Sequence, residues 1–212
     1  MRINPGYATY HTGYETFYLV DKMIDQGFKI HQGCSRFALL TLKYLSDSVL
    51  LPYSVVQLPQ AMAKALNGIK ENGQQDTLMD IYDKYGLLPE AVDNFTTEAK
   101  KFQIMVQQHI PTMNPVTVRS YNDLMMRLEQ VFILPEGLRG RPDVRHAVFS
   151  PSQFNNYAAA AFPMITDLLY GLEKLSGDDL INRHKEICKH ISDLTIMVHS
   201  AINMLKEDMN QI

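Results

Sequence analysis

The chain lacks the features that mark several large classes of protein. Its 212 residues contain no block of lysine and arginine, and a formal net charge of −3 offers nucleic acid no basic face. No uninterrupted apolar run approaches the roughly 18 residues that a membrane-spanning helix needs. The segment Met1–Gly6 has no apolar stretch of the kind found in a signal peptide. The sequence as it stands is therefore expected to be soluble and untargeted.

Motifs of several enzyme classes are also missing. The sequence contains no Gly-x-Ser-x-Gly elbow, phosphate loop, His-Glu-x-x-His motif or Gly-x-Gly-x-x-Gly motif. Its two cysteines, Cys34 and Cys188, show no Cys-x-x-Cys spacing, and we expect both to be small buried apolar residues. The sequence leaves a disulfide between them open. A composition of 46% apolar and 20% charged residues suits one globular domain, or one domain with a remnant of another.

Strand patterns are scarce, and helical periodicity dominates the sequence. The expected helices cover residues 14–25, 30–47, 54–70, 89–109, about 118–132, 162–175 and a long final segment. Residues 135–152, rich in Gly, Pro and Arg, are expected to form a long ordered loop. The segment Leu50–Tyr53 interrupts the pattern, because the residue before a proline is disfavoured in a helix. We place a domain boundary there, which gives residues 1–50 and 51–212.

The final helix has the clearest pattern in the chain. Its apolar positions alternate at spacings of four and three: Leu180, His184, Ile187, Ile191, Leu194, Val198, Ala201 and Leu205, widened by Ile181, Cys188 and Ile202. Such a seam packs against other helices at shallow crossing angles, as in helical bundles. The sequence therefore predicts an all-α bundle over residues 53–210. His184 and Cys188 share a face of this helix but His190 does not, so we expect a seam histidine and a buried cysteine rather than metal ligands.

Tyr10 and His11 lie on a loop with Gly13, just ahead of the first expected helix. An imidazole is a common zinc ligand, but catalytic zinc needs three or more protein ligands. No residue near His11 in the sequence completes such a set. The phenol of Tyr10 has the chemistry to donate a hydrogen bond to a developing oxyanion, although a surface tyrosine beside a loop is the alternative.

The stretch from Tyr10 to Thr16 resembles the Tyr-His-Ser-x-Tyr-Glu-Thr segment of the glutamate carboxypeptidase II (prostate-specific membrane antigen) family. Further matches to that family follow in the same order and at nearly the same spacing: Phe28-Lys29-x-His31, Ser48-x-x-Leu51-Pro52-Tyr53, Asn94-Phe95-Thr96, Phe102, Arg141-Pro142-x-x-Arg145-His146, Pro151-Ser152, Asn155-x-Tyr157 and Phe162-Pro163. This ordered set resembles the C-terminal part of such a zinc peptidase, including its transferrin-receptor-like dimerisation domain.

The resemblance implies a helical dimerisation domain over residues 51–212. It implies that residues 1–50 are a loop and two helices left over from an α/β zinc peptidase domain. His11 then corresponds to the last protein ligand of a two-zinc site, and Tyr10 to a residue that faces the substrate. The positions of the family's other metal ligands and of its glutamate base are absent. We therefore expect a homodimerisation domain that binds no cofactor and has no activity alone.

The alternative is that the chain forms part of a zinc-dependent exopeptidase acting on small peptides, completed by upstream sequence. A third hypothesis is a receptor-like binding module, because the transferrin receptors contain this helical domain but have no catalytic activity. Asn156 and Tyr157 align with a Lys-Tyr pair that, in glutamate-specific members, grips the substrate carboxylates. A neutral Asn156 predicts a weaker preference for glutamate, since charge-assisted hydrogen bonds are stronger. A simple turn is the other interpretation of this segment.

Arg141, Arg145 and His146 either line the same cleft or hold the long loop by bonding backbone carbonyls, and we favour the second role. Asn94 begins the sequence's N-glycosylation sequon. Family members are commonly membrane-anchored with an ectodomain outside the cell. The resemblance thus implies an extracellular location, which the sequence alone leaves open, as it does the substrate.

Overall fold

The computed structural model describes residues 8–109, 113–154 and 159–209. It divides into two compact units, Met1–Pro52 and Tyr53–Ile212. The predicted all-α class is confirmed, because the structure is 71% helical. Within the described residues, extended structure is limited to two short strands and two isolated bridges. No helix in this described part combines the length and the apolar character needed to cross a membrane.

The first unit contains one regular helix preceded by irregular turns. The single helix expected over residues 14–25 is wrong in detail: a short α1 (Phe17–Leu19) leads into a π-helical turn (Val20–Ile24) and a 3-10 turn (Gln26–Phe28). Gly27 and Phe28 have φ angles of 71° and 56°, and this left-handed backbone breaks the helical run. Helix α2 (Lys29–Asp47) follows close to its expected bounds, and none of its residues is buried.

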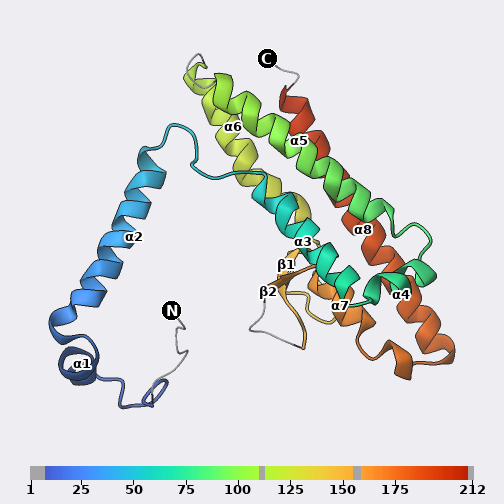
Figure 1. The fold of residues 1–212 in the computed structure, drawn as a ribbon, viewed down its shortest axis with the longest axis horizontal. Helices are drawn as coiled ribbons and strands as arrows, with labels where there is room; N and C mark the ends of the chain where they lie inside the picture. Colours follow the sequence, from blue (N-terminus) through green and yellow to red (C-terminus); the bar gives the residue numbers. More distant parts are fainter. Residues whose placement is uncertain (1–7, 110–112, 155–158, 210–212) are drawn as a thin grey trace. The chain divides into compact units, whose positions relative to one another are not determined.

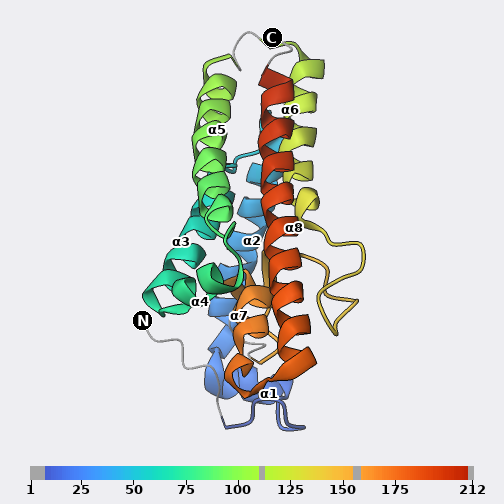
Figure 2. The same ribbon diagram turned by 90° about the vertical axis from the view of Figure 1, so that its right-hand side faces the viewer.

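The second unit is a bundle built mainly from four helices, α3 (Gln57–Glu71), α5 (Leu87–His109), α6 (Pro115–Arg127) and α8 (Gly177–Met209). Helices α5 and α8 run side by side in the same direction, and α6 returns beside α8 (Figures 1 and 2). Helix α3 packs against α5. The predicted helical bundle is therefore confirmed.

The core of the bundle is formed by the apolar stripes of these helices. Phe95 of α5 faces Phe132, with ring centroids 6.4 Å apart, and Phe102 meets the edge of Tyr121 of α6 at 5.7 Å. The predicted seam of α8 is buried at Ile187, Ile191, Leu194, Val198, Ala201 and Leu205. Ile181 was expected to widen this seam, but its side chain is 52% exposed, so that expectation is wrong.

Local sequence explains where two of the helices begin. The side chain of Asn114 accepts hydrogen bonds from the N–H groups of Val116 and Thr117, and Pro115 occupies the first turn of α6. Gly73, with φ of 70°, precedes a short helix α4 (Gln74–Ile81). The sequence did not predict α4, because its eight residues carry only one buried side chain, Leu78.

The segment between α6 and α8, which includes the loop predicted over residues 135–152, contains two short strands and a helix. A 3-10 turn (Leu128–Phe132) leads into tight turns, and strand β1 (Phe149–Pro151) then pairs antiparallel with β2 (Ala159–Ala161). Helix α7 (Pro163–Leu169) and a 3-10 turn (Leu172–Lys174) occupy the range expected as one helix over 162–175. Tyr170 and Gly171 separate these two pieces, and Gly171 has a left-handed φ of 71°.

Candidate functional site

Tyr10 and His11 lie together in a turn of the first unit. Their rings stack with centroids 3.8 Å apart and planes inclined by 21°, and both residues are exposed. His11 has a left-handed φ of 60°, and its backbone N–H donates a hydrogen bond to Glu15 Oε2 at 3.1 Å. This turn presents the imidazole and the phenol side by side on the surface.

The surroundings of His11 do not supply a zinc site. Within residues 8–109, 113–154 and 159–209, no group of three or more His, Cys, Asp or Glu side chains is placed to hold a metal ion. A catalytic zinc ion needs at least three protein ligands and an open position. Among the described residues, His11 alone therefore does not fit a resident metal.

Asp25 fixes the start of α2. Its carboxylate accepts hydrogen bonds from the N–H groups of Ile30 and His31, both at 2.9 Å, and lies 2.7 Å from His31 Nδ1. Burial alone would raise the pKa of Asp25, but the bonds from Ile30 and His31 outweigh it and lower the pKa to about 2. Asp25 thus satisfies free N–H groups in the first turn of the helix.

In the second unit, a buried carboxylate organises the loop that precedes the predicted substrate residues. Asp167 of α7 lies 3.2 Å from Arg141 Nη2 and accepts hydrogen bonds from Ser152 Oγ at 2.5 Å and from Gln153 N at 2.8 Å. Arg141 Nη1 also donates to the carbonyl of Pro151 at 2.7 Å. These bonds attach the chain just after β1 to α7.

The predicted substrate residues Asn156 and Tyr157 lie outside the described residues. The residues on either side are described: Pro151 pairs with Ala159 across the β1–β2 ladder. The rings of Phe154 and Tyr170 lie 4.2 Å apart.

Arg145 and His146 also hold the backbone of the long loop. Arg145 Nε donates to the carbonyl of Leu134 at 3.1 Å. His146 Nδ1 accepts hydrogen bonds from the N–H groups of Val148 and Phe149, at 3.2 and 3.0 Å. Burial lowers the pKa of His146, and nearby Glu129 opposes that shift. With Arg141, these contacts follow the structural role that the sequence analysis favours.

The cysteines do not match the expectation of burial. Cys34 is exposed on α2, Cys188 is partly buried, and both are free thiols. Cys188 Sγ lies 3.6 Å from the carbonyl of Ile81, and His190, on the same helix, is 5% exposed. Sequence spacing placed His190 away from the seam, yet the loop between α6 and α7 covers it. The apolar periodicity of α8 alone does not predict that this loop buries His190.

The sequence of the second unit matches a known domain family. Residues 77–206, which run from α4 to α8, match the transferrin receptor-like dimerisation domain. This match covers more than half of the chain. The chain therefore belongs to the transferrin receptor-like dimerisation domain family.

Comparison with curated proteins confirms the predicted resemblance to glutamate-carboxypeptidase-like proteins. The aminopeptidase NAALADL1 of Rattus norvegicus is 33% identical over 163 residues, which are 74% of this chain and 21% of that protein. A probable glutamate carboxypeptidase, LAMP1 of Arabidopsis thaliana, is 24% identical over 176 residues, 83% of this chain and 25% of that protein. The probable glutamate carboxypeptidase VP8 of Zea mays is 29% identical over 178 residues, which are 80% of this chain and 24% of that protein. The chain thus spans about a fifth to a quarter of these relatives.

Proposed function

We propose that this chain is the homodimerisation domain of a glutamate-carboxypeptidase-like protein and has no peptidase activity by itself. The observation that carries the proposal is the family match over residues 77–206, which coincides with the packed helices from α4 to α8. Helices α5 and α8 of this match pack against each other within one chain, so the bundle forms before a second copy binds.

The proposed lack of activity is supported by the isolation of His11. The described residues offer it no neighbouring acidic, histidine or cysteine side chains in a metal-binding group. A lone imidazole in water binds zinc far more weakly than three or four converging ligands do. Tyr10 beside it therefore has no activated water or peptide carbonyl to assist.

Size-exclusion chromatography with light scattering tests the dimer. We expect a mass near twice the 24.2 kDa of one chain at high protein concentration, falling toward one chain on dilution. Native mass spectrometry of a mixture of unlabelled and ¹⁵N-labelled chains should show a dimer of intermediate mass. A folded chain that stays monomeric at every concentration is the result that rejects the proposal.

A second candidate function is favoured by the surface of α2. Four apolar residues of this helix, Ile30, Phe37, Leu40 and Tyr44, are between 64% and 74% exposed. A contiguous exposed apolar surface of this kind marks a place where another polypeptide packs. Under this proposal, an upstream peptidase domain covers α2 and completes a zinc site to which His11 contributes one ligand.

The second candidate assigns an exopeptidase activity to the completed protein. The names of the relatives, an aminopeptidase and probable glutamate carboxypeptidases, support a peptide substrate without fixing which end is cleaved. Metal analysis and a peptide-release assay are made on the chain alone and on a protein in which the proposed upstream peptidase domain completes it. Zinc and turnover that appear only in the completed protein, and are lost in His11→Ala, would favour the second candidate. Stoichiometric zinc and turnover in the chain alone would reject the inactive domain.

Asn94 carries the proposal of an extracellular location. It lies on the exposed side of α5, two residues before Thr96. An oligosaccharide attached to Asn94 would therefore not need to enter the buried core of the bundle. The chain should gain mass when it is produced through a eukaryotic secretory pathway, and a glycosidase should remove that mass. Asn94→Gln is the control, and an unmodified Asn94 under these conditions would contradict the proposal.

A further inference from the structure

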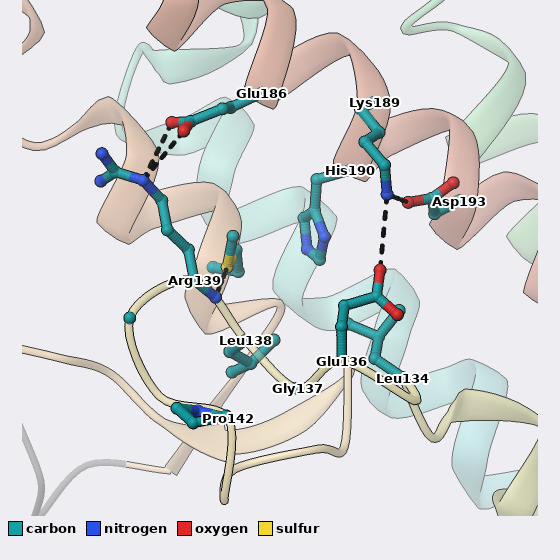
Figure 3. A pocket seen from close by; sticks show the side chains of 12 residues that line it. Leu134, Glu136, Gly137, Leu138, Arg139, Pro142, Glu186, Lys189, His190 and Asp193 are labelled. Atoms are coloured by element: carbon teal, nitrogen blue, oxygen red, sulfur yellow. Dashed lines mark hydrogen bonds and ion pairs between the residues drawn. The ribbon is translucent and has the colours of Figure 1, made fainter.

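A cavity lies between the loop that follows Phe132 and the helices α7 and α8. Its volume is about 290 Å³, close to the lower end of the range for small-ligand sites. Apolar side chains line much of it: Leu134, Leu138 and Pro142 from the loop, and Met164 from α7. Figure 3 shows the side chains of Leu134, Leu138 and Pro142 and the His190 ring of α8 around a common space.

His190 Nε2 is a buried polar atom of this cavity that has no hydrogen-bond partner among the described residues. Its residue is 5% exposed, and Nε2 is buried without a hydrogen bond to any described atom of the protein. Figure 3 shows the ring projecting from α8 toward the loop near Leu138 and Glu136. A buried polar atom without a partner is unfavourable, because it has lost its hydrogen bonds with water. The geometry therefore leaves a position for a ligand atom beside Nε2.

The imidazole of His190 is neutral near pH 7. Burial lowers its pKa to about 4, with Asp193 opposing the shift and Lys189 adding to it. One ring nitrogen then carries the proton and the other accepts, and the tautomer decides which role Nε2 takes. A hydroxyl group can donate or accept, so it satisfies Nε2 in either tautomer.

The charged groups around the cavity are already paired with one another. Arg139 Nε lies 3.0 Å from Glu186 Oε2. Lys189 Nζ lies 2.7 Å from Asp193 Oδ2 and 3.6 Å from Glu136 Oε1. An anionic ligand would enter beside three carboxylates, and a cationic ligand would compete with the arginine and lysine that already bind them. An uncharged ligand avoids both penalties.

The wall of the cavity is held in place before any ligand arrives. Gly137 has a φ of 74°, and a Cβ atom there would lie 2.5 Å from the carbonyl oxygen of Pro142. The backbone N–H of Arg139 points to Met164 Sδ at 3.3 Å, which ties the loop to α7. A preformed wall reduces the ordering that binding requires.

We propose that this cavity binds a small uncharged molecule with an apolar ring and one hydroxyl group, and that the hydroxyl bonds to His190 Nε2. The ring lies against Leu138, Pro142 and Met164. Phenol has the required size and chemistry and serves as the probe. Benzene tests the apolar contribution alone, and benzoate tests whether a negative charge is tolerated.

The test uses the 212-residue chain labelled with ¹³C at the methionine methyl groups. The Met164 signal is assigned with the variant Met164→Leu. Phenol should shift this signal selectively among the 12 methionines, and benzoate should not shift it at the same concentration. His190→Leu should weaken phenol binding about fivefold to tenfold, through the loss of one hydrogen bond, and leave benzene binding within about twofold. His199→Leu, at an exposed histidine of the same helix, should change neither.

Three outcomes would overturn the proposal. The first is a Met164 signal that phenol leaves unchanged at millimolar concentration, as expected if water alone satisfies His190. The second is equal weakening of phenol and benzene in a folded His190→Leu chain, which would show that the nitrogen makes no specific bond. The third outcome needs no variant and applies if His190→Leu does not fold. If the unaltered chain binds benzene as tightly as phenol, the hydroxyl group makes no contribution and the proposal is rejected.

Discussion

Asp167 on α7 and Arg141 in the preceding loop form an ion pair of 3.2 Å whose side chains are 8% and 18% exposed. The same carboxylate accepts hydrogen bonds from Ser152 and Gln153, so one buried charge joins α7 to two separate points of the loop. Few elements of secondary structure hold this region, because β1 and β2 have three residues each. Side-chain bonds to Asp167 therefore replace the regular hydrogen bonds of a longer sheet.

Removing the charge of Asp167 should destabilise the second unit strongly. Asp167→Asn keeps the size of the side chain but leaves Arg141 without its ionic partner, which should lower the free energy of unfolding by about 2–4 kcal/mol. Urea unfolding followed by circular dichroism measures this change. The control is Asp123→Asn, which removes a 3.8 Å pair with an 82% exposed Arg119. Its effect should stay below about 1 kcal/mol, and equal effects of the two variants would contradict the role of Asp167.

Gly137 and Gly140 allow a matched test of close packing in the loop. Both have left-handed φ angles, 74° and 69°, but only Gly137 has an atom within 4 Å of its Cβ position, Pro142 O at 2.5 Å. Gly140→Ala should cost about 1 kcal/mol through backbone strain alone. Gly137→Ala should cost about 2–4 kcal/mol, because the backbone must also move. Thermal or urea unfolding of the two variants measures the difference, and a smaller cost at Gly137 would show that the close approach is relaxed in solution.

Asp25 should make the start of α2 sensitive to pH in an acidic window. Its pKa is lowered from 3.8 to about 2, so the carboxylate's contribution to stability is complete above pH 4 and is lost as the pH falls toward 2. The backbone amide signals of Ile30 and His31, followed by NMR between pH 5 and pH 1.5, should titrate with a midpoint near the lower value. Asp25→Asn should abolish this transition, whereas the exposed Asp47→Asn should preserve it. A midpoint near 3.8 would contradict the hydrogen-bonded arrangement.

The two cysteines should differ in reactivity. Cys34 is exposed on α2, whereas burial raises the pKa of Cys188 and reduces its thiolate fraction. A water-soluble disulfide reagent should modify Cys34 rapidly and Cys188 at least about tenfold more slowly at neutral pH. Cys34→Ser should remove the fast phase and Cys188→Ser the slow one. A single fast phase that survives in Cys34→Ser would show that Cys188 is more accessible than the structure indicates.

The long helices and the bundle could be predicted from the sequence, because their burial repeats along a single segment. In α8, the residues that recur at spacings of four and three between Ile187 and Leu205 are buried in the core. The periodicity within this one helix therefore predicts which of its side chains pack against neighbouring helices. The same rule misplaced Ile181, which is 52% exposed although the adjacent seam residue Leu180 is partly buried. A pattern within one helix cannot reveal how far the surrounding helices extend.

The features that the sequence could not predict depend on contacts between distant segments. The burial of His190 comes from the loop that contains Leu138, about 50 residues earlier in the chain. Strands β1 and β2 are too short to show alternation, and α4 is too short to show a helical stripe. Arg141 and Arg145 were recognised as a pair of candidate loop anchors, but their backbone carbonyl partners follow only from the folded geometry.

Sedimentation equilibrium of the 212-residue chain, over a wide range of concentrations, tests the central claim most directly. A homodimerisation domain should fit a reversible equilibrium between 24.2 kDa and twice that mass, with the dimer dominant at the highest concentrations. A folded chain that sediments as a single species of 24.2 kDa throughout would contradict the account.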